Sequence, residues 1–109
     1  MSTKIINSPI ADEFKRELRA IYGEGLADLI MFGSYARGDF RADSDIDFAI
    51  VLKDPATRTA AEIFRLAPLS AELSLKYGVI VSILPVSEQK LQTSGQGVYE
   101  SIRREGIRI

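Results

Sequence analysis

The stretch that decides the fold runs from Met31 to Leu52 and reads MFGSYARGDFRADSDIDFAIVL. Within it, a Gly-Ser pair is followed after ten residues by an acid, any residue and a second acid, Asp45 and Asp47. The segment from Ile46 to Leu52 is almost wholly apolar and rich in strand-forming residues. The pattern therefore predicts a buried β-strand that begins at the two acids.

The spacing of Asp45 and Asp47 favours a metal site. Side chains two residues apart on a strand point the same way, with Cα atoms about 6.6 Å apart. Two such carboxylates can converge on divalent cations, and two-metal phosphoryl-transfer sites hold their ions roughly 3.5 to 4 Å apart. Without a cation the two charges repel each other, and partial burial increases that cost. The structural alternative is a pair of solvated acids at the mouth of a strand.

The Gly-Ser pair, Gly33 and Ser34, follows a short apolar strand predicted over Leu26 to Phe32 and opens a turn that extends to Gly38. Glycine lets the backbone approach a ligand closely, free N–H groups at a turn favour anions, and the serine hydroxyl adds a donor. The turn is therefore a candidate phosphate cradle. Alone it is weak evidence, because such turns are common, but its fixed distance from the acid pair strengthens it.

Arg37 lies inside this turn. Its guanidinium could bind triphosphate oxygens in a bidentate manner, or it could form a salt bridge with Asp39 or Asp43. The sequence leaves both interpretations open.

The segment resembles the GSx(10)DxD signature of the DNA polymerase beta type nucleotidyltransferase superfamily, and the short chain resembles its minimal nucleotidyltransferase (MNT) branch. The match is residue by residue at Gly33, Ser34, Asp45 and Asp47. This resemblance implies the nucleotidyltransferase fold, magnesium on the two aspartates, and the β and γ phosphates of ATP on the Gly-Ser pair. It also implies transfer of AMP to an acceptor hydroxyl. Stand-alone domains of this kind commonly act as antitoxins that modify a tyrosine of a HEPN-domain toxin, so such a toxin is the expected partner.

The family pattern includes a third carboxylate on the neighbouring strand, and this chain departs from it. The strand is predicted over Val79 to Leu84, and Ser82 stands where the acid is expected. Serine is a neutral and poor magnesium ligand. Two functions therefore remain open: an active enzyme, or a nucleotide-fold binding module that neutralises a toxin by contact. The acids that could replace the missing group are Asp39, Asp43, Glu72 and Glu88.

Other phosphate and metal motifs fit poorly. Acids at positions 43, 45, 47 and 54 match EF-hand spacing, but Phe48 occupies the position that requires glycine. The sequence contains no GxxxxGK[ST] loop and no GxGxxG fingerprint.

Composition limits the function further. The chain of 109 residues is predicted to form one domain, residues 1–109. Its net charge of -1 gives no electrostatic case for direct nucleic-acid binding. Cysteine and histidine are absent, so any chemistry is expected to depend on carboxylates. Since the sequence has no long apolar run and no signal-peptide pattern, we expect a cytoplasmic protein without membrane contact.

The remaining pattern predicts an α+β fold, a small mixed β-sheet covered by helices. We expect a short edge strand through Lys4 to Ile6 and a helix capped by Ser8 that runs from Pro9 to about Tyr22. A second helix should begin at a capping box, Thr59 and Glu62, and end at Tyr77, with a kink or break at Pro68. The last predicted elements are the strand over 79–84 closed by Pro85, a helical turn over 87–91, a helix over 98–105 and an edge strand over 107–109.

Overall fold

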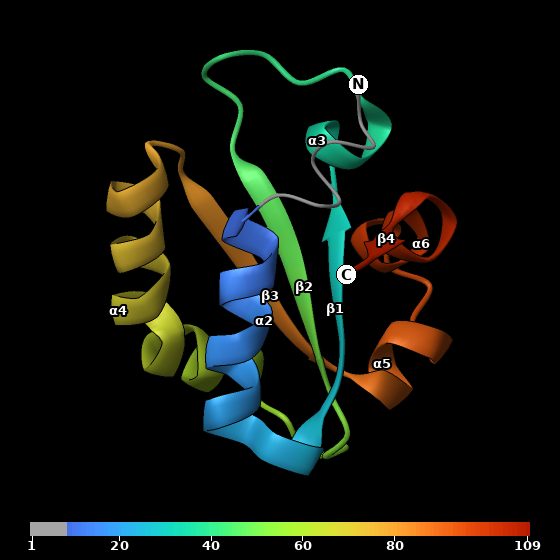
Figure 1. Cartoon of the computed structure of the whole chain (residues 1–109). Coiled ribbons are helices and arrows are strands. Elements are labelled where there is room, and N and C mark those ends of the chain that lie inside the picture. The colour runs from blue at the N-terminus through green and yellow to red at the C-terminus, as the bar shows by residue number, and fades with distance from the viewer. Residues whose placement is uncertain (1–8) are drawn as a thin grey trace.

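The structure, a computed structural model, describes residues 9–109. Its sheet has four strands in the order β3-β2-β1-β4 (Figure 1). The strands are β1 (Leu26–Phe32), β2 (Ile46–Leu52), β3 (Val81–Ser87) and β4 (Ile107–Arg108). β1 is antiparallel to both β2 and β4, whereas β2 and β3 are parallel. The predicted α+β class with a mixed sheet is confirmed.

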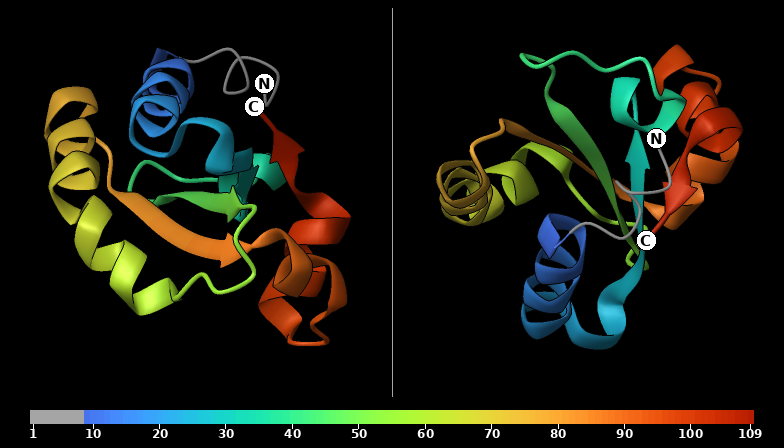
Figure 2. Two further views of the ribbon diagram at one scale, coloured as in Figure 1. Left: turned by 90° about the horizontal axis from the view of Figure 1, so that it is seen from below. Right: turned by 45° about the horizontal axis from the view of Figure 1, so that its top comes forward.

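Helices cover both faces of this sheet. Figure 2 shows α2 and α4 on one side of the sheet and α5 and α6 on the other. The helical elements are α2 (Pro9–Tyr22), the 3-10 turn η1 (Gly23–Gly25), α3 (Ser34–Arg37), α4 (Thr59–Tyr77), α5 (Glu88–Thr93) and α6 (Gly97–Glu105). The parallel pairing of β2 and β3 requires a long crossover between them, and α4 supplies it.

The central strand β2 divides the core into two clusters. Its even-numbered side chains pack with α2 and α4, and Phe48 meets Phe14 of α2 edge to face at 5.2 Å between ring centroids. Ala49 and Val51 pack instead with side chains of α5 and α6. Because side chains alternate along a strand, Asp47 belongs to the α6 side of the sheet.

The predicted helices and strands mostly stand where the sequence placed them. The helix from Pro9 to Tyr22 is confirmed, as are the strand over Leu26–Phe32, the final helix and a short last strand. The proposed strand through Lys4 to Ile6 and the Ser8 cap lie outside the described residues. No described helix is long and apolar enough to cross a membrane.

Of the kink or break predicted at Pro68, the break is wrong, since α4 continues through the proline as one helix. Leu66 and Leu73 are fully buried on either side of the proline and anchor both halves to the same core. Pro68 itself is exposed, so the carbonyl that loses its helical partner faces water. Figure 2 shows that α4 follows a curved path along the sheet, as expected for a helix bent around a core.

The capping box at the start of α4 is also wrong. The N-cap residue is Arg58, and its side chain forms no capping hydrogen bond with the first turn of the helix. The Thr59 hydroxyl donates instead to the Pro85 carbonyl of β3 at 2.7 Å, and Glu62 accepts a hydrogen bond from the Tyr22 hydroxyl. Tertiary partners therefore replace the local cap.

The predicted third strand, residues 79–84, begins two residues before β3 begins and ends three residues before β3 ends. Pro85, expected to close it, lies inside β3 opposite Ile50. β3 is an edge strand, where a missing backbone N–H is tolerated.

Candidate functional site

The candidate site forms where β1 ends and β2 begins. Phe32, the last residue of β1, pairs with Asp47, which pairs on its other side with Ser82 of β3. A Cβ added to Gly33 would collide with the Asp47 carboxylate. The Gly-Ser turn and the second acid are therefore in direct contact, with Ser82 beside them on the same face.

The predicted turn after Gly33 is a single helical turn, α3. Gly33 has φ of 76°, a conformation that favours glycine, and its carbonyl accepts hydrogen bonds from the N–H groups of Ala36 and Arg37, both at 3.1 Å. Gly38 ends the turn with φ of 84°. The first N–H groups of a helix have no partner within it, so the start of α3 offers donors beside the Asp47 carboxylate.

The two aspartates differ in their surroundings. Asp45 precedes β2 and is exposed, whereas Asp47 lies in the strand and is half-buried. Burial raises the pKa of Asp47, and the negative charge of Asp45 raises it further. A hydrogen bond with Ser82 and the positive charge of Arg37 act in the opposite direction. The pair thus concentrates negative charge in a place where a hard cation would relieve it, which fits a divalent metal held by carboxylate oxygens.

A third carboxylate does not join this pair. The described residues contain no group of three or more histidines, cysteines or acids placed to hold a metal ion. Glu88 follows the far end of β3, more than about 16 Å along the strand from Ser82. Asp39 instead pairs with Arg37. The geometry thus leaves Ser82 as the neighbour of Asp47 at the position where the family pattern implies an acid.

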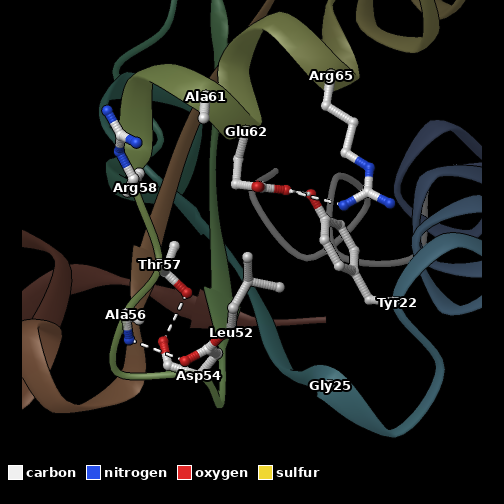
Figure 3. Close-up of a pocket in the computed structure, with 10 residues that line it drawn as sticks. All are labelled: Tyr22, Gly25, Leu52, Asp54, Ala56, Thr57, Arg58, Ala61, Glu62 and Arg65. Carbon is white, nitrogen blue, oxygen red and sulfur yellow. Dashed lines mark hydrogen bonds and ion pairs between the residues drawn. The ribbon is translucent and has the colours of Figure 1, made fainter.

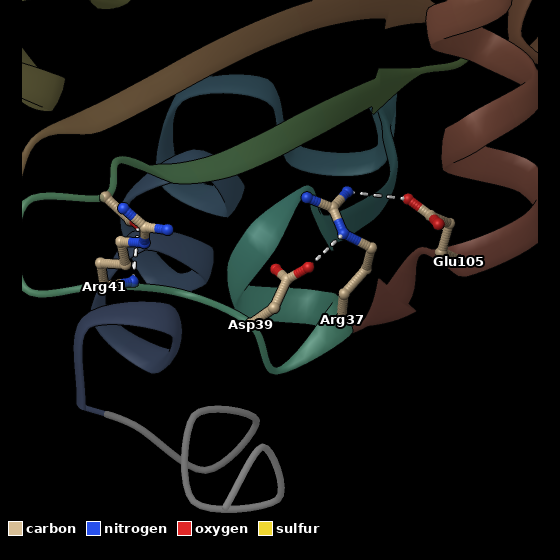
Figure 4. Close-up of polar contacts among 5 residues, drawn as sticks. Arg37, Asp39, Arg41 and Glu105 are labelled. Atoms are coloured by element: carbon tan, nitrogen blue, oxygen red, sulfur yellow. Dashed lines mark hydrogen bonds and ion pairs between the residues drawn. The ribbon is translucent and has the colours of Figure 1, made fainter.

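Arg37 forms two ion pairs at the edge of the site (Figure 4). Its Nε lies 3.2 Å from Asp39 Oδ2, and its Nη1 lies 3.2 Å from Glu105 Oε1 at the end of α6. Hydrogen bonds with Asp39 and then Glu105 raise the pKa of Arg37. The salt bridge with Asp39 that the sequence left open is present, and the role in phosphate binding stays a prediction.

Glu105 is the site neighbour that sequence reasoning missed. It stands 68 residues from Arg37, and no local pattern links the two positions.

The loop between α3 and β2 is held by contacts among its own residues. The Tyr35 and Phe40 rings stack at 4.3 Å between their centroids, and Ser44 Oγ accepts a hydrogen bond from the Arg41 N–H at 2.8 Å.

A pocket of about 260 Å³ lies at the opposite end of β2, near Leu52 (Figure 3). Its polar side chains largely satisfy one another. The Tyr22 hydroxyl donates to Glu62 at 2.5 Å, and Arg65 lies 3.6 Å from the same carboxylate and over the Tyr22 ring. Burial raises the pKa of Tyr22, and the hydrogen bond with Glu62 raises it further. None of the predicted site residues lines this pocket. We therefore assign the candidate site to the mouth of β2.

Known proteins resemble this chain over most of its length. The sequence profile of the nucleotidyltransferase domain matches residues 11–109. A protein of Methanocaldococcus jannaschii, named as a candidate protein adenylyltransferase, is 35% identical over 86 residues, which are 78% of this chain and 83% of that protein.

Two solved structures share the fold. A candidate nucleotidyltransferase from Sulfolobus solfataricus superimposes with a TM-score of 0.66 at 19% identity, over 91% of this chain and 75% of that one. A toxin-antitoxin structure with AMP-PNP gives a TM-score of 0.62 at 20% identity, over 93% and 72%. At such identities the likeness shows the fold alone.

We predict that Gly33→Ala destabilises the protein more than Gly78→Ala does. Both glycines have positive φ, but only at Gly33 would the added Cβ also meet a carboxylate. Gly78→Ala should therefore cost about 1–2 kcal/mol of conformational strain, and Gly33→Ala should add to it the displacement of Asp47. Urea unfolding measures both. Equal losses of stability would show that the contact with Asp47 is not a close one.

We also predict that Asp47→Asn raises the melting temperature of the metal-free protein by a few degrees at neutral pH. The pKa of Asp47 is higher in the folded protein than in the unfolded chain. The folded protein therefore loses stability as the pH rises through the interval between these two pKa values, and this loss remains at higher pH. The difference between variant and wild type should therefore shrink at acid pH. Thermal unfolding from pH 3 to 8 checks this, with Asp43→Asn as the exposed control. A lower melting temperature for Asp47→Asn throughout would contradict it.

Proposed function

Since this chain belongs to the nucleotidyltransferase domain family, we propose that it transfers AMP from ATP to an acceptor hydroxyl in the presence of magnesium. The observation that carries the proposal is the contact between Gly33 and Asp47. It joins a turn suited to phosphate and an acid suited to metal at one end of the sheet.

Each group at the site has a defined task in this reaction. Asp45 and Asp47 hold Mg²⁺, which would neutralise charge on the phosphates. The backbone of Gly33 and the hydroxyl of Ser34 hold the β and γ phosphates, and their fixed positions reduce the entropy lost on reaching the transition state. The acceptor oxygen bonds to the α phosphorus and gives up its proton to solvent, while the bond to pyrophosphate breaks and pyrophosphate leaves.

Arg37 is suited to assist at the phosphates. Its guanidinium already bridges two carboxylates at the edge of the site, and phosphate oxygens match the same donor geometry. A bound triphosphate would compete with Asp39 and Glu105 for it.

The proposed acceptor is a tyrosine of a HEPN-domain toxin, with this protein acting as its antitoxin. Two findings support it. A relative carries the name of a candidate protein adenylyltransferase, and a structural neighbour is a toxin-antitoxin structure containing an ATP analogue.

Ser82 favours a second candidate function, a binding module that neutralises a toxin without turnover. It stands beside Asp47 where the family pattern implies a carboxylate, and a hydroxyl supplies neither a strong metal ligand nor a group to take the proton of the acceptor. A thousandfold slower chemical step would correspond to roughly 4 kcal/mol of barrier, enough to remove turnover while binding persists.

Transfer of label from α-labelled ATP tests the enzyme claim. With magnesium and the candidate toxin, wild type should label the toxin, Asp45→Asn should lose about a thousandfold in rate, and Asp43→Asn should stay near wild type. If wild type binds the toxin tightly and transfers nothing, the enzyme claim fails. Toxin neutralisation by the Asp45→Asn, Asp47→Asn double variant then tests the second function, because a pure binder should lose little.

We predict that Ser82→Asp raises the magnesium-dependent rate at least tenfold over Ser82→Ala, about 1.4 kcal/mol of barrier. The new carboxylate would stand directly opposite Asp47 in the register of β2 and β3. Without magnesium it should lower the melting temperature, because a third like charge joins the pair. A rate unchanged by Ser82→Asp at saturating magnesium would show that a third ligand does not limit the reaction.

A further inference from the structure

The outer face of α4 carries an exposed apolar stripe. Phe64 is 84% exposed and Leu75 is 87% exposed, and Pro68 and Ala71 between them are also exposed. At 3.6 residues per turn these four residues fall on one side of the helix. The buried residues of α4, Leu66 and Leu73, lie on the opposite side.

No described element covers this stripe. In both views of Figure 2, α4 is an outermost element and its outer side faces away from the sheet and from α2. Two large side chains that expose more than four-fifths of their surface on one helix face are unusual for a surface without a partner. The face is therefore suited to an interaction.

The spacing of the stripe suits pairing with a second copy of the same helix. The steps from Phe64 to Pro68, Ala71 and Leu75 are four, three and four residues, the spacing of a coiled-coil seam. This series reads the same in both directions. Two copies of α4 in antiparallel orientation would therefore place Phe64 against Leu75 of the other copy and Pro68 against Ala71, in a closed two-fold arrangement.

The charges beside the stripe complement the same arrangement. Arg65 and Glu72 lie on the same side of the stripe. In an antiparallel pair of helices, this side faces the same side of the other copy. Arg65 would then stand close to Glu72 of the other copy, and the two-fold axis repeats the pair. Glu72 forms no ion pair with any residue that the structure describes. Arg65 lies 3.6 Å from Glu62 and over the Tyr22 ring, so pairing with Glu72 of the other copy would draw it away from these exposed contacts.

We propose that this protein associates with a second copy of itself through an antiparallel pairing of the two α4 helices. The proposal does not rest on the proposed function. The seam covers three helical turns, about 16 Å, and buries less than the roughly 800 Å² per partner of a standard stable interface. The dimer is therefore weak and forms in a concentration-dependent way, with a Kd between about 10 µM and 1 mM.

Sedimentation equilibrium from about 1 µM to 1 mM tests the association. Wild type should move from monomer to dimer across this range, and Phe64→Glu and Leu75→Glu should each weaken the association at least tenfold. Val98→Glu, at a partly exposed position on α6, should not. A wild type that stays monomeric throughout, or Phe64→Glu and Leu75→Glu variants that associate as wild type does, would overturn the proposal and assign the face to a different partner.

Charge exchange tests the pairing of Arg65 with Glu72. Arg65→Glu and Glu72→Arg should each weaken dimerisation, because like charges then face each other, and the double variant should restore it. A double variant weaker than both single variants would contradict the pairing.

Cysteine mapping tests the orientation, which is possible because the chain has no cysteine of its own. Under mild oxidation, a mixture of Phe64→Cys and Leu75→Cys proteins should form a disulfide-linked dimer. Phe64→Cys alone should not, because its two copies stand about 16 Å apart along the antiparallel pair. Efficient linkage of Phe64→Cys to itself would exclude the antiparallel register.

Discussion

The candidate site is built around one constraint, a carboxylate that the sheet holds at the mouth of β2 although its surroundings disfavour the charge. Asp47 is half-buried in β2, a strand whose other residues are buried, and both its burial and its neighbour Asp45 make the charged form unfavourable. The fold keeps space for this group, since a side chain at Gly33 would displace it. A charge held in unfavourable surroundings is typical of a binding site, because a bound cation offsets the free-energy cost of keeping the carboxylate charged.

The part of the site that the sequence predicted is the part encoded within one hairpin. The Gly-Ser pair and the two acids lie on β1, α3 and β2, and the antiparallel register pairs Phe32 with Asp47. Their spacing along the chain therefore determines their spacing in space. Short runs of apolar, strand-forming residues predicted the strands for the same reason, because such a run is itself the local signal of a buried strand.

What the sequence could not predict depends on tertiary contacts. Pro68 has the local chemistry of a helix break, yet the buried Leu66 and Leu73 hold α4 together across it. Thr59 has the local chemistry of a cap, yet its hydroxyl bonds to β3. Glu105 reaches Arg37 only because α6 folds back beside α3. In each case packing between distant segments overrides a preference of a few residues.

Helix α4 links the candidate site to the exposed apolar stripe. It is the crossover between β2 and β3, the two strands whose parallel pairing places Ser82 beside Asp47. Its last turn is tied to the start of that strand, since Ser74 Oγ accepts a hydrogen bond from the Val81 N–H at 2.9 Å. The same helix presents Phe64 outward. A second copy seated on α4 would therefore contact the helix that leads into β3, whereas the mouth of the site opens beside α3, on the side of the sheet opposite α4.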